Sequence, residues 1–227
     1  YKYGAIAGNV LLMMFYTTVS GWMLYYFYKM AVGGFVGLDA KGVGNVFGSL
    51  LSDPVTMAGN MIIIVLSCFG VCYLGVKAGV ERITKNMMAC LLLLMLILAV
   101  NSISLPNSAA GLKYYLYPDF NRVLEHGIRE VVFAAMGQAF FTLSLGIGSL
   151  AIFGSYIGKE QRLTGEAMWI MALDTFVAIV SGLIIFPACF SFGINPDSGP
   201  NLLFITLPNV FNAMSGGRIW GTMFFLF

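Results

Sequence analysis

The chain has 227 residues, of which 59% are hydrophobic and only 10% are charged. Soluble domains carry about 25% charged residues, and a soluble fold of this size could not bury so much apolar surface. The composition therefore excludes a soluble protein and indicates an integral membrane protein. The formal net charge of +2 is too small to indicate a nucleic-acid partner.

Apolar runs long enough to cross a bilayer, which needs about 20 residues per helix, follow one another along the chain. We predict five full transmembrane helices and a sixth that is cut short, at residues 5–32, 58–77, 83–104, 130–157, 166–190 and 218–227. The sixth run is still apolar where the sequence stops, and the first residue is not methionine. We therefore expect an internal fragment, with residues 1–227 forming a single transmembrane domain.

Charged loops set the predicted orientation of these spans. The junctions 77–85 and 158–165 hold an excess of lysine and arginine, which the positive-inside rule places in the cytoplasm. The segments 33–57, 105–129 and 191–217 then lie on the outer side.

Two of the outer segments are expected to contain helices. Residues 39–52 could form a short interfacial helix. Residues 201–214 are apolar but too short to span, and Pro208 interrupts them. Two interpretations stay open for this second piece: a re-entrant or lid-like helical pair, and an amphipathic surface helix.

The fourth span places poor helix formers at its midpoint, in the stretch GQAFFTLSLGIG (137–148). Glycine costs about 0.8–1.0 kcal/mol relative to alanine in a helix. Small residues can allow close helix packing. Alternatively, an unwound segment around Ser144–Gly146 would present bare carbonyl and N–H groups that bind ions and substrate. Composition alone leaves both interpretations open.

The first and fifth spans each carry a polar group at membrane depth. Asp174 costs about 2.5–3.5 kcal/mol there, so it needs a partner: either it belongs to an ion site or it is a protonated structural carboxyl. Tyr16 lies too deep for the interfacial aromatic belt, which favours a hydroxyl facing a central cavity. Tyr25, Tyr26 and Tyr28 fit the belt better.

Nothing in the sequence indicates catalysis. There is no Ser/His/Asp set, no glycine-rich phosphate loop and no paired acid site, so we predict no catalytic residue and no organic cofactor. The cysteines lie in apolar runs and fit free thiols better than metal ligands.

Four stretches, taken together, resemble the sodium-coupled neurotransmitter and amino-acid symporters, the family with the LeuT fold. GQAFFTLSLGIGSL (137–150) is similar to the sixth-helix signature of that family, and FYTTVSGWMLYYF (15–27) to its third helix. GLKYYLYPDF (111–120) resembles the loop before helix six, and GPNLLFITLPNVFNAMSGG (199–217) the fourth outer loop. The resemblance implies an all-α LeuT-like fragment that covers helices three to eight of about twelve, without helices one, two and nine onward.

The resemblance also implies roles for individual residues. Tyr16 matches the tyrosine that binds the substrate carboxylate and helps to close the outer gate, and Phe141 matches the aromatic lid. The implied substrate-binding residues are Leu12, Tyr16, Phe141, Ser144 and Ile147. The implied ligands of a sodium ion are Thr142 and Asp174, and the implied gating residues are Tyr16, Phe141, Gln138 and Tyr156.

Several positions depart from the family pattern. Asp174 stands where many members have asparagine, and Ala178 where chloride-dependent members have serine. A fixed carboxylate could replace the charge of chloride, so we expect chloride-independent transport. Ile147 stands where a larger aromatic side chain is common, which leaves room for a bulkier substrate. The sequence Met87-Met88-Ala89 replaces a frequent proline, which argues against helix unwinding there.

We therefore expect sodium-coupled symport of a zwitterionic amino acid into the cell by alternating access, with sodium ions and the lipid bilayer as partners. The alternative is a non-transporting or channel-like polytopic membrane protein. The short outer loops and the absence of N-x-[ST] sequons favour a bacterial inner membrane. The sequence does not indicate the oligomeric state.

Overall fold

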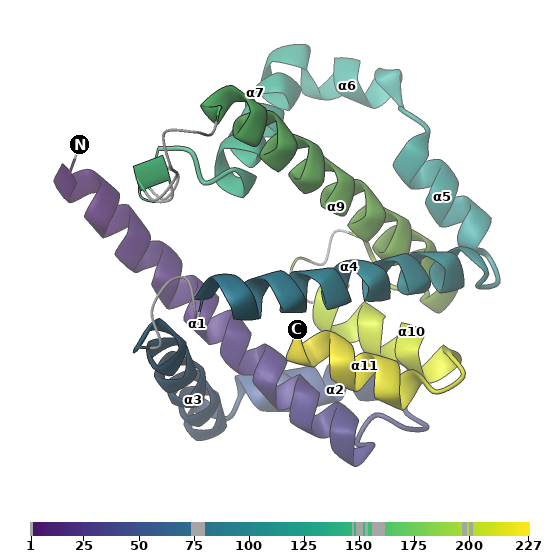
Figure 1. Ribbon diagram of the computed structural model, residues 1–227. Coiled ribbons are helices and arrows are strands. Elements are labelled where there is room, and N and C mark those ends of the chain that lie inside the picture. Colours follow the sequence, from purple (N-terminus) through teal and green to yellow (C-terminus); the bar gives the residue numbers. More distant parts are fainter. Residues whose placement is uncertain are drawn as a thin grey trace. The chain divides into compact units, whose positions relative to one another are not determined.

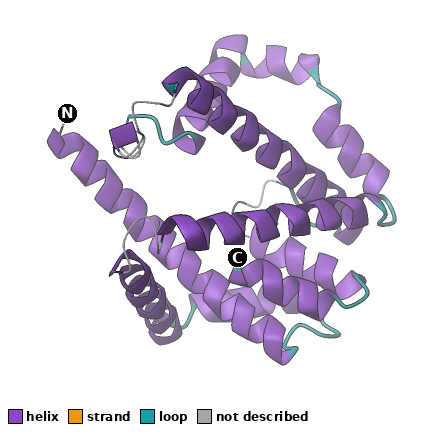
Figure 2. Ribbon diagram, in the orientation of Figure 1, coloured by secondary structure: helices purple, strands orange, loops and turns teal. Residues whose placement is uncertain are grey.

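The computed structural model describes residues 2–73, 80–146, 148, 152, 154–155, 162–196, 199 and 202–227. Within these ranges every regular element is a helix, which confirms the predicted all-α class (Figure 2). The elements, shown in Figure 1, are α1 (Lys2–Val32), α2 (Ala40–Leu51), α3 (Pro54–Tyr73), α4 (Arg82–Ile103), α5 (Ser108–Leu116), α6 (Phe120–His126), α7 (Ile128–Thr142), α9 (Leu163–Phe192), η2 (Leu202–Thr206), α10 (Leu207–Ala213) and α11 (Gly217–Leu226).

Four of the described helices are long and apolar enough to cross a membrane. They are Tyr3–Val32, Pro54–Tyr73, Arg82–Ile103 and Leu163–Phe192. Each overlaps one of the predicted spans 5–32, 58–77, 83–104 and 166–190. The run 130–157 does not form one uninterrupted helix, because α7 ends at Thr142.

The chain divides into two compact units. Unit 1 consists of Tyr1–Met13 and Tyr117–Ile179, and unit 2 consists of Met14–Leu116 and Val180–Phe227. The long helices α1 and α9 therefore each contribute residues to both units. The single transporter domain stays a prediction.

The helix α2 follows directly from its sequence. The Asp39 carboxylate accepts a hydrogen bond of 2.8 Å from the Gly42 N–H, which caps the first turn. Val43, Phe47 and Leu50 recur at helical spacing and are buried on one face. This amphipathic pattern is why the helix predicted at residues 39–52 could be located from sequence.

The transition from α2 to α3 is sharp because Asp53 and Pro54 favour a helix start. Asp53 Oδ1 accepts hydrogen bonds from the N–H groups of Val55 and Thr56, each at 3.1 Å. Proline suits the first helical turn, where its missing N–H costs nothing. Further along, α3 approaches α1 closely: a Cβ atom at Gly21 would lie 3.0 Å from the Met61 nitrogen.

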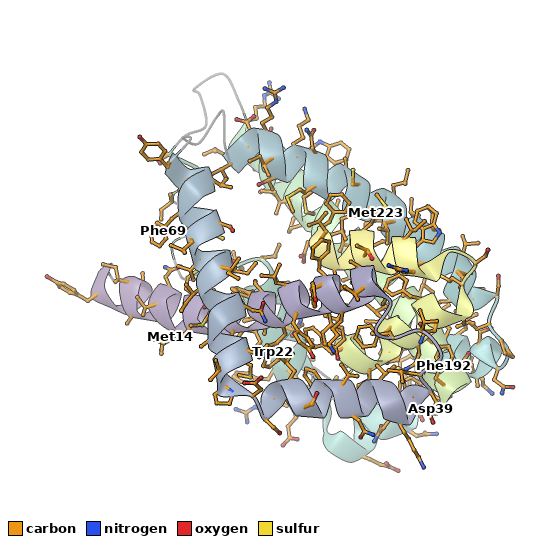
Figure 3. The ribbon with its side chains drawn as sticks, turned by 90° about the horizontal axis from the view of Figure 1, so that it is seen from below. Met14, Trp22, Asp39, Phe69, Phe192 and Met223 are labelled. Carbon is orange, nitrogen blue, oxygen red and sulfur yellow. The ribbon has the colours of Figure 1, made fainter. Side chains whose placement is uncertain are left out.

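An aromatic cluster forms the core of unit 2, and Tyr26 lies at its centre with no exposed surface. Its ring centroid is 5.0 Å from that of Phe35, 5.0 Å from that of Phe204 and 5.3 Å from that of Phe225. Trp22 points from α1 toward α2, where it meets the edge of the Phe47 ring (Figure 3). The assignment of Tyr26 to the interfacial belt is therefore wrong, because aromatic partners from distant segments enclose it.

The outer piece after residue 200 is a buried helix. Phe204, Leu207, Val210 and Phe211 each have at most 2% of their surface exposed. The elements η2 and α10 contact α2, and α10 also contacts α11. Burial on this scale favours an inserted helix over an amphipathic surface helix, which would leave one face exposed.

Arg218 joins the beginning of α11 to the end of α1. Its Nε donates a hydrogen bond of 3.0 Å to the Ala31 carbonyl, and a second guanidinium nitrogen donates to the same oxygen. The last carbonyls of a helix lack intrahelical partners and carry partial negative charge. Arg218 therefore stabilises the C-terminal end of α1.

Candidate functional site

The site begins where α7 stops, in the middle of the apolar run of unit 1. The Leu143 N–H donates to the Ala139 carbonyl, the Ser144 N–H to the Phe141 carbonyl at 3.1 Å, and the Leu145 N–H to the Phe140 carbonyl at 2.9 Å. These bonds change from the i−4 pattern to i−3 and i−5, which closes the helix in an irregular turn.

Backbone angles after α7 are incompatible with a continued helix. Ser144 has φ of 52°, and Gly146 and Gly148 have φ of 86° and 84°. A serine in this left-handed region is uncommon and costs energy, and such residues cluster at functional sites. The structure thus favours the unwound segment over simple close packing of a continuous helix.

The side chains in the last turns of α7 are exposed. Phe141 is 52% exposed, and Gln138 and Thr142 are also exposed. The Thr142 hydroxyl donates only a long hydrogen bond, 3.4 Å, to the Ala139 carbonyl. The hydroxyl oxygen of Thr142 keeps lone pairs that could bind a cation.

Asp174 lies in the part of α9 that belongs to unit 1, and its side chain is half-buried. Among the described residues it forms no hydrogen bond and no ion pair. A carboxylate in such an apolar helix requires a counter-charge or a proton. The Asp174 carboxylate is a negatively charged oxygen ligand, and hard cations bind oxygen ligands of this kind.

The predicted site residues of α1 fall in different units. Leu12 belongs to unit 1, together with α7 and Asp174, whereas Tyr16 belongs to unit 2. The Tyr16 side chain is 40% exposed, and its ring lies 5.8 Å from that of Phe15. Ile147 and Tyr156 lie outside the described residues, so their predicted roles stay predictions.

No group of three or more His, Cys, Asp or Glu side chains is close enough to hold a metal ion in the described part of the chain. Asp174 can offer a carboxylate to an ion, Thr142 a hydroxyl, and the end of α7 main-chain carbonyl oxygens.

The sequence analysis missed a hollow of about 660 Å³ in unit 2, with both polar and apolar lining residues. Its polar lining includes Asp39, Lys41, Asn209 and Asn212, with Phe192 beside them (Figure 3). The Asn212 amide donates at 2.7 Å to the Phe35 carbonyl, which fixes α10 to the segment after α1.

A family model and several known proteins match the chain. The model of the sodium:neurotransmitter symporter family matches residues 45–227. An uncharacterized sodium-dependent transporter, YhdH of Bacillus subtilis (strain 168), is 37% identical over 222 residues, covering 97% of this chain and 47% of the relative. The sodium- and chloride-dependent taurine transporter of Canis lupus familiaris is 27% identical over 188 residues, covering 78% of this chain and 30% of that protein.

A solved structure is also similar. The crystal structure of MhsT in complex with L-phenylalanine has a TM-score of 0.90 at 36% identity, covering 98% of this chain and 50% of that chain. The present chain thus spans about half the length of YhdH and of MhsT.

Proposed function

Because the chain belongs to the sodium:neurotransmitter symporter family, we propose that its protein carries a zwitterionic amino acid into the cell together with sodium. Members of this family are transporters and not enzymes. The observation that carries the proposal is the break of α7 after Thr142, with a left-handed Ser144, in an apolar run that also presents Phe141. A binding site made of main-chain groups at membrane depth is typical of secondary transporters.

The proposed sodium site uses Thr142 and Asp174. A sodium ion between these oxygens neutralises the Asp174 carboxylate, which has no described partner of its own. The substrate carboxylate completes the shell of the ion. Each ligand then raises the affinity for the other, because coupling between two bound ligands is reciprocal.

The proposed substrate site uses both the open turn and α1. Ser144 and the unwound backbone receive the substrate ammonium, Tyr16 donates to its carboxylate, and Leu12 and Ile147 line the side-chain pocket. Phe141 closes over the substrate, and Gln138 and Tyr156 take part in gating on the outer and cytoplasmic sides. L-Phenylalanine, the molecule in the MhsT structure, is the first substrate to test, since Ile147 leaves room for a large side chain.

We further propose that transport is independent of chloride. The taurine transporters are described as sodium- and chloride-dependent, whereas this chain carries its own carboxylate at Asp174 and an apolar Ala178 one turn later. In proteoliposomes, replacing chloride by gluconate should leave uptake by the full-length protein unchanged. A collapse of uptake in gluconate would contradict this part of the proposal.

The deciding experiment measures the thermal stability of the purified full-length protein. Sodium and an amino acid together should raise the unfolding temperature more than the sum of their separate effects. A channel-like or non-transporting protein would show no such coupling, and uptake driven by a sodium gradient then tests transport itself. A panel of amino acids in the same assay identifies the substrate. We also propose that the protein is located in a bacterial inner membrane.

A further inference from the structure

A mostly apolar groove of about 580 Å³ lies between the end of α1 and the beginning of α11, within unit 2. The residues that line it are Ala31, Gly216, Arg218, Ile219, Thr222 and Met223, the last of which is labelled on α11 in Figure 3. Among these lining residues Arg218 alone carries a charge. Apolar walls with one cation fit an amphipathic ligand that carries a negative charge.

The two helices that form the groove are held together by close contacts. A Cβ atom on Gly221 of α11 would lie 2.8 Å from the Met30 Cε atom and 3.0 Å from the Phe211 Cδ2 atom. Met30 is 2% exposed and Phe211 is 1% exposed. The glycine therefore allows α11 to lie directly against α1, and the walls of the groove belong to a packed core.

The Arg218 guanidinium is fixed in place, but no described residue neutralises its charge. Its Nε atom and one terminal nitrogen both donate to the Ala31 carbonyl. The other terminal nitrogen, Nη1, has no hydrogen bond and no ion pair with a described residue. It lies beside the turn after α1, 3.6 Å from a Cβ atom built on Gly33. A guanidinium held in this way is already oriented to bind a phosphate group.

The groove lies at the ends of two predicted membrane spans. Ala31 is in the last turn of Tyr3–Val32, which is long and apolar enough to cross a membrane. Arg218 is the first residue of the predicted span 218–227, and the other residues of that span are uncharged. When both spans cross a bilayer, the guanidinium therefore lies near the lipid headgroups, and the rest of the groove follows α11 toward the hydrocarbon.

We propose that this groove binds an anionic phospholipid: Arg218 Nη1 donates to the lipid phosphate, and one acyl chain lies along Ile219 and Met223. Charge complementarity selects this occupant, because a monoanionic lipid neutralises the guanidinium and brings no cation of its own. Ile219 is 67% exposed and Met223 is 39% exposed, so both side chains are available to an acyl chain. The inference requires a membrane protein but does not depend on the proposed transport of an amino acid.

The test is a lipid titration of the purified full-length protein after delipidation in a neutral detergent. Phosphatidylglycerol should raise the unfolding temperature, and the concentration required should be about tenfold lower than for phosphatidylcholine with the same acyl chains. Inorganic phosphate at the same concentrations should produce no shift, because it has no chain to cover the apolar walls.

The first variant is Arg218→Gln, which should abolish the preference for phosphatidylglycerol over phosphatidylcholine. This variant also changes the contact with Ala31, so the measured quantity is the shift that lipid causes and not the unfolding temperature itself. Lys29→Gln is the matched control, because it removes a positive charge near the same end of α1. The Lys29 ammonium lies 5.6 Å from the centroid of the Tyr25 ring and does not line the groove, so this control should keep the preference.

The second variant, Ile219→Ser, tests the acyl contact and leaves Arg218 in place, so the proposal stays testable if Arg218→Gln does not fold. We expect the required concentration of phosphatidylglycerol to rise by about threefold to tenfold, since part of the apolar wall is lost. Ile62→Ser is its matched control, because Ile62 is 53% exposed on α3 and lies outside the groove. This control should leave the lipid response unchanged.

Four results would overturn the inference. Equal responses to phosphatidylglycerol and phosphatidylcholine would show that the groove does not recognise an anionic lipid. An equal shift with inorganic phosphate would indicate a site for a free anion. An equal loss in Arg218→Gln and Lys29→Gln would indicate a diffuse effect of surface charge. No lipid response at all would show that another part of the longer protein fills the groove.

Discussion

Phe47 and Phe204 stack face to face, with ring centroids 5.1 Å apart and planes only 8° apart, although 157 residues separate them in the sequence. The pair joins α2 to η2, and the Trp22 ring makes a T-shaped contact with each of the two rings, at interplanar angles of 82° and 77°. Phe204 is 1% exposed, so the outer segment after residue 200 is anchored through this side chain.

The first prediction concerns this anchor. Phe204→Ala should lower the stability of the protein by about 3–5 kcal/mol, since truncating a buried phenylalanine loses burial and leaves a cavity. Phe120→Ala is the control, because Phe120 is 70% exposed. Thermal unfolding in detergent compares the two variants. Equal losses for both would contradict the role of the stack.

The second prediction concerns Asp53 and pH. Hydrogen bonds from the Thr56 hydroxyl, at 2.5 Å, and from the Thr56 N–H lower the pKa of this carboxyl. A carboxyl whose folded pKa lies below its unfolded value contributes stability above the unfolded pKa, near 4, and loses it as the pH falls through the folded pKa. The unfolding temperature of Asp53→Ala should therefore lie below that of wild type at pH 7 and approach it below about pH 4.

The variant Asp53→Asn distinguishes the effect of the negative charge at position 53 from the effect of the hydrogen bonds that this side chain accepts at the beginning of α3. Asparagine is also a good N-cap residue, so this variant should keep most of the stability at pH 7 and show a weaker dependence on pH. A pH profile of Asp53→Asn identical to that of wild type would show that the titration belongs to another group.

The third prediction concerns the broken helix. Gly146 has φ of 86° and open space around its α-carbon, so alanine would be strained there by backbone conformation and not by crowding. We expect Gly146→Ala to cost about 1–2 kcal/mol of stability and to weaken phenylalanine binding. Gly137 also has open space but lies within α7, so Gly137→Ala should be neutral or stabilising by up to about 1 kcal/mol. The same sign for both variants would show that the turn is not held in the left-handed conformation.

The fourth prediction concerns Asp174. Asp174→Ala should weaken sodium and substrate binding together, each on the order of tenfold, because the two are coupled through the ion. Asp174→Asn keeps an oxygen ligand but removes the charge, so its uptake should become dependent on chloride. Titration of thermal stability with each ligand measures the first effect, and uptake in chloride and in gluconate measures the second. Unchanged sodium dependence in Asp174→Ala would remove this residue from the sodium site.

A structural feature could be predicted from the sequence where it depends mainly on a residue and its neighbours along the chain. The break after α7 was expected only as one of two alternatives, because a glycine such as Gly146 tolerates a left-handed conformation but also allows close packing of a continuous helix. A helix at residues 39–52 was expected, but its buried face, which includes Val43 and Phe47, was not predicted. The helical nature of the long spans followed from length and apolarity alone.

The role of Tyr26 could not be read in the same way. In a helix that is apolar on every side, periodicity does not distinguish the face toward protein from the face toward lipid. Its partners Phe204 and Phe225 come from segments that meet it only in the folded chain. The close contact of the Tyr115 ring in α5 with Gly182 in α9 was hidden for a similar reason, because the loop 105–129 gave no sign that it contained the packed helix α5.

The left-handed turn after α7 has a consequence for how such proteins diversify. A cradle made of peptide groups keeps its shape when neighbouring side chains change, provided that the glycines which permit it are retained. If Leu12 and Ile147 line the pocket as proposed, selection for a new substrate can act at these two positions without changing the peptide groups of the turn. One ancestral fold could thus be inherited by carriers of many different solutes.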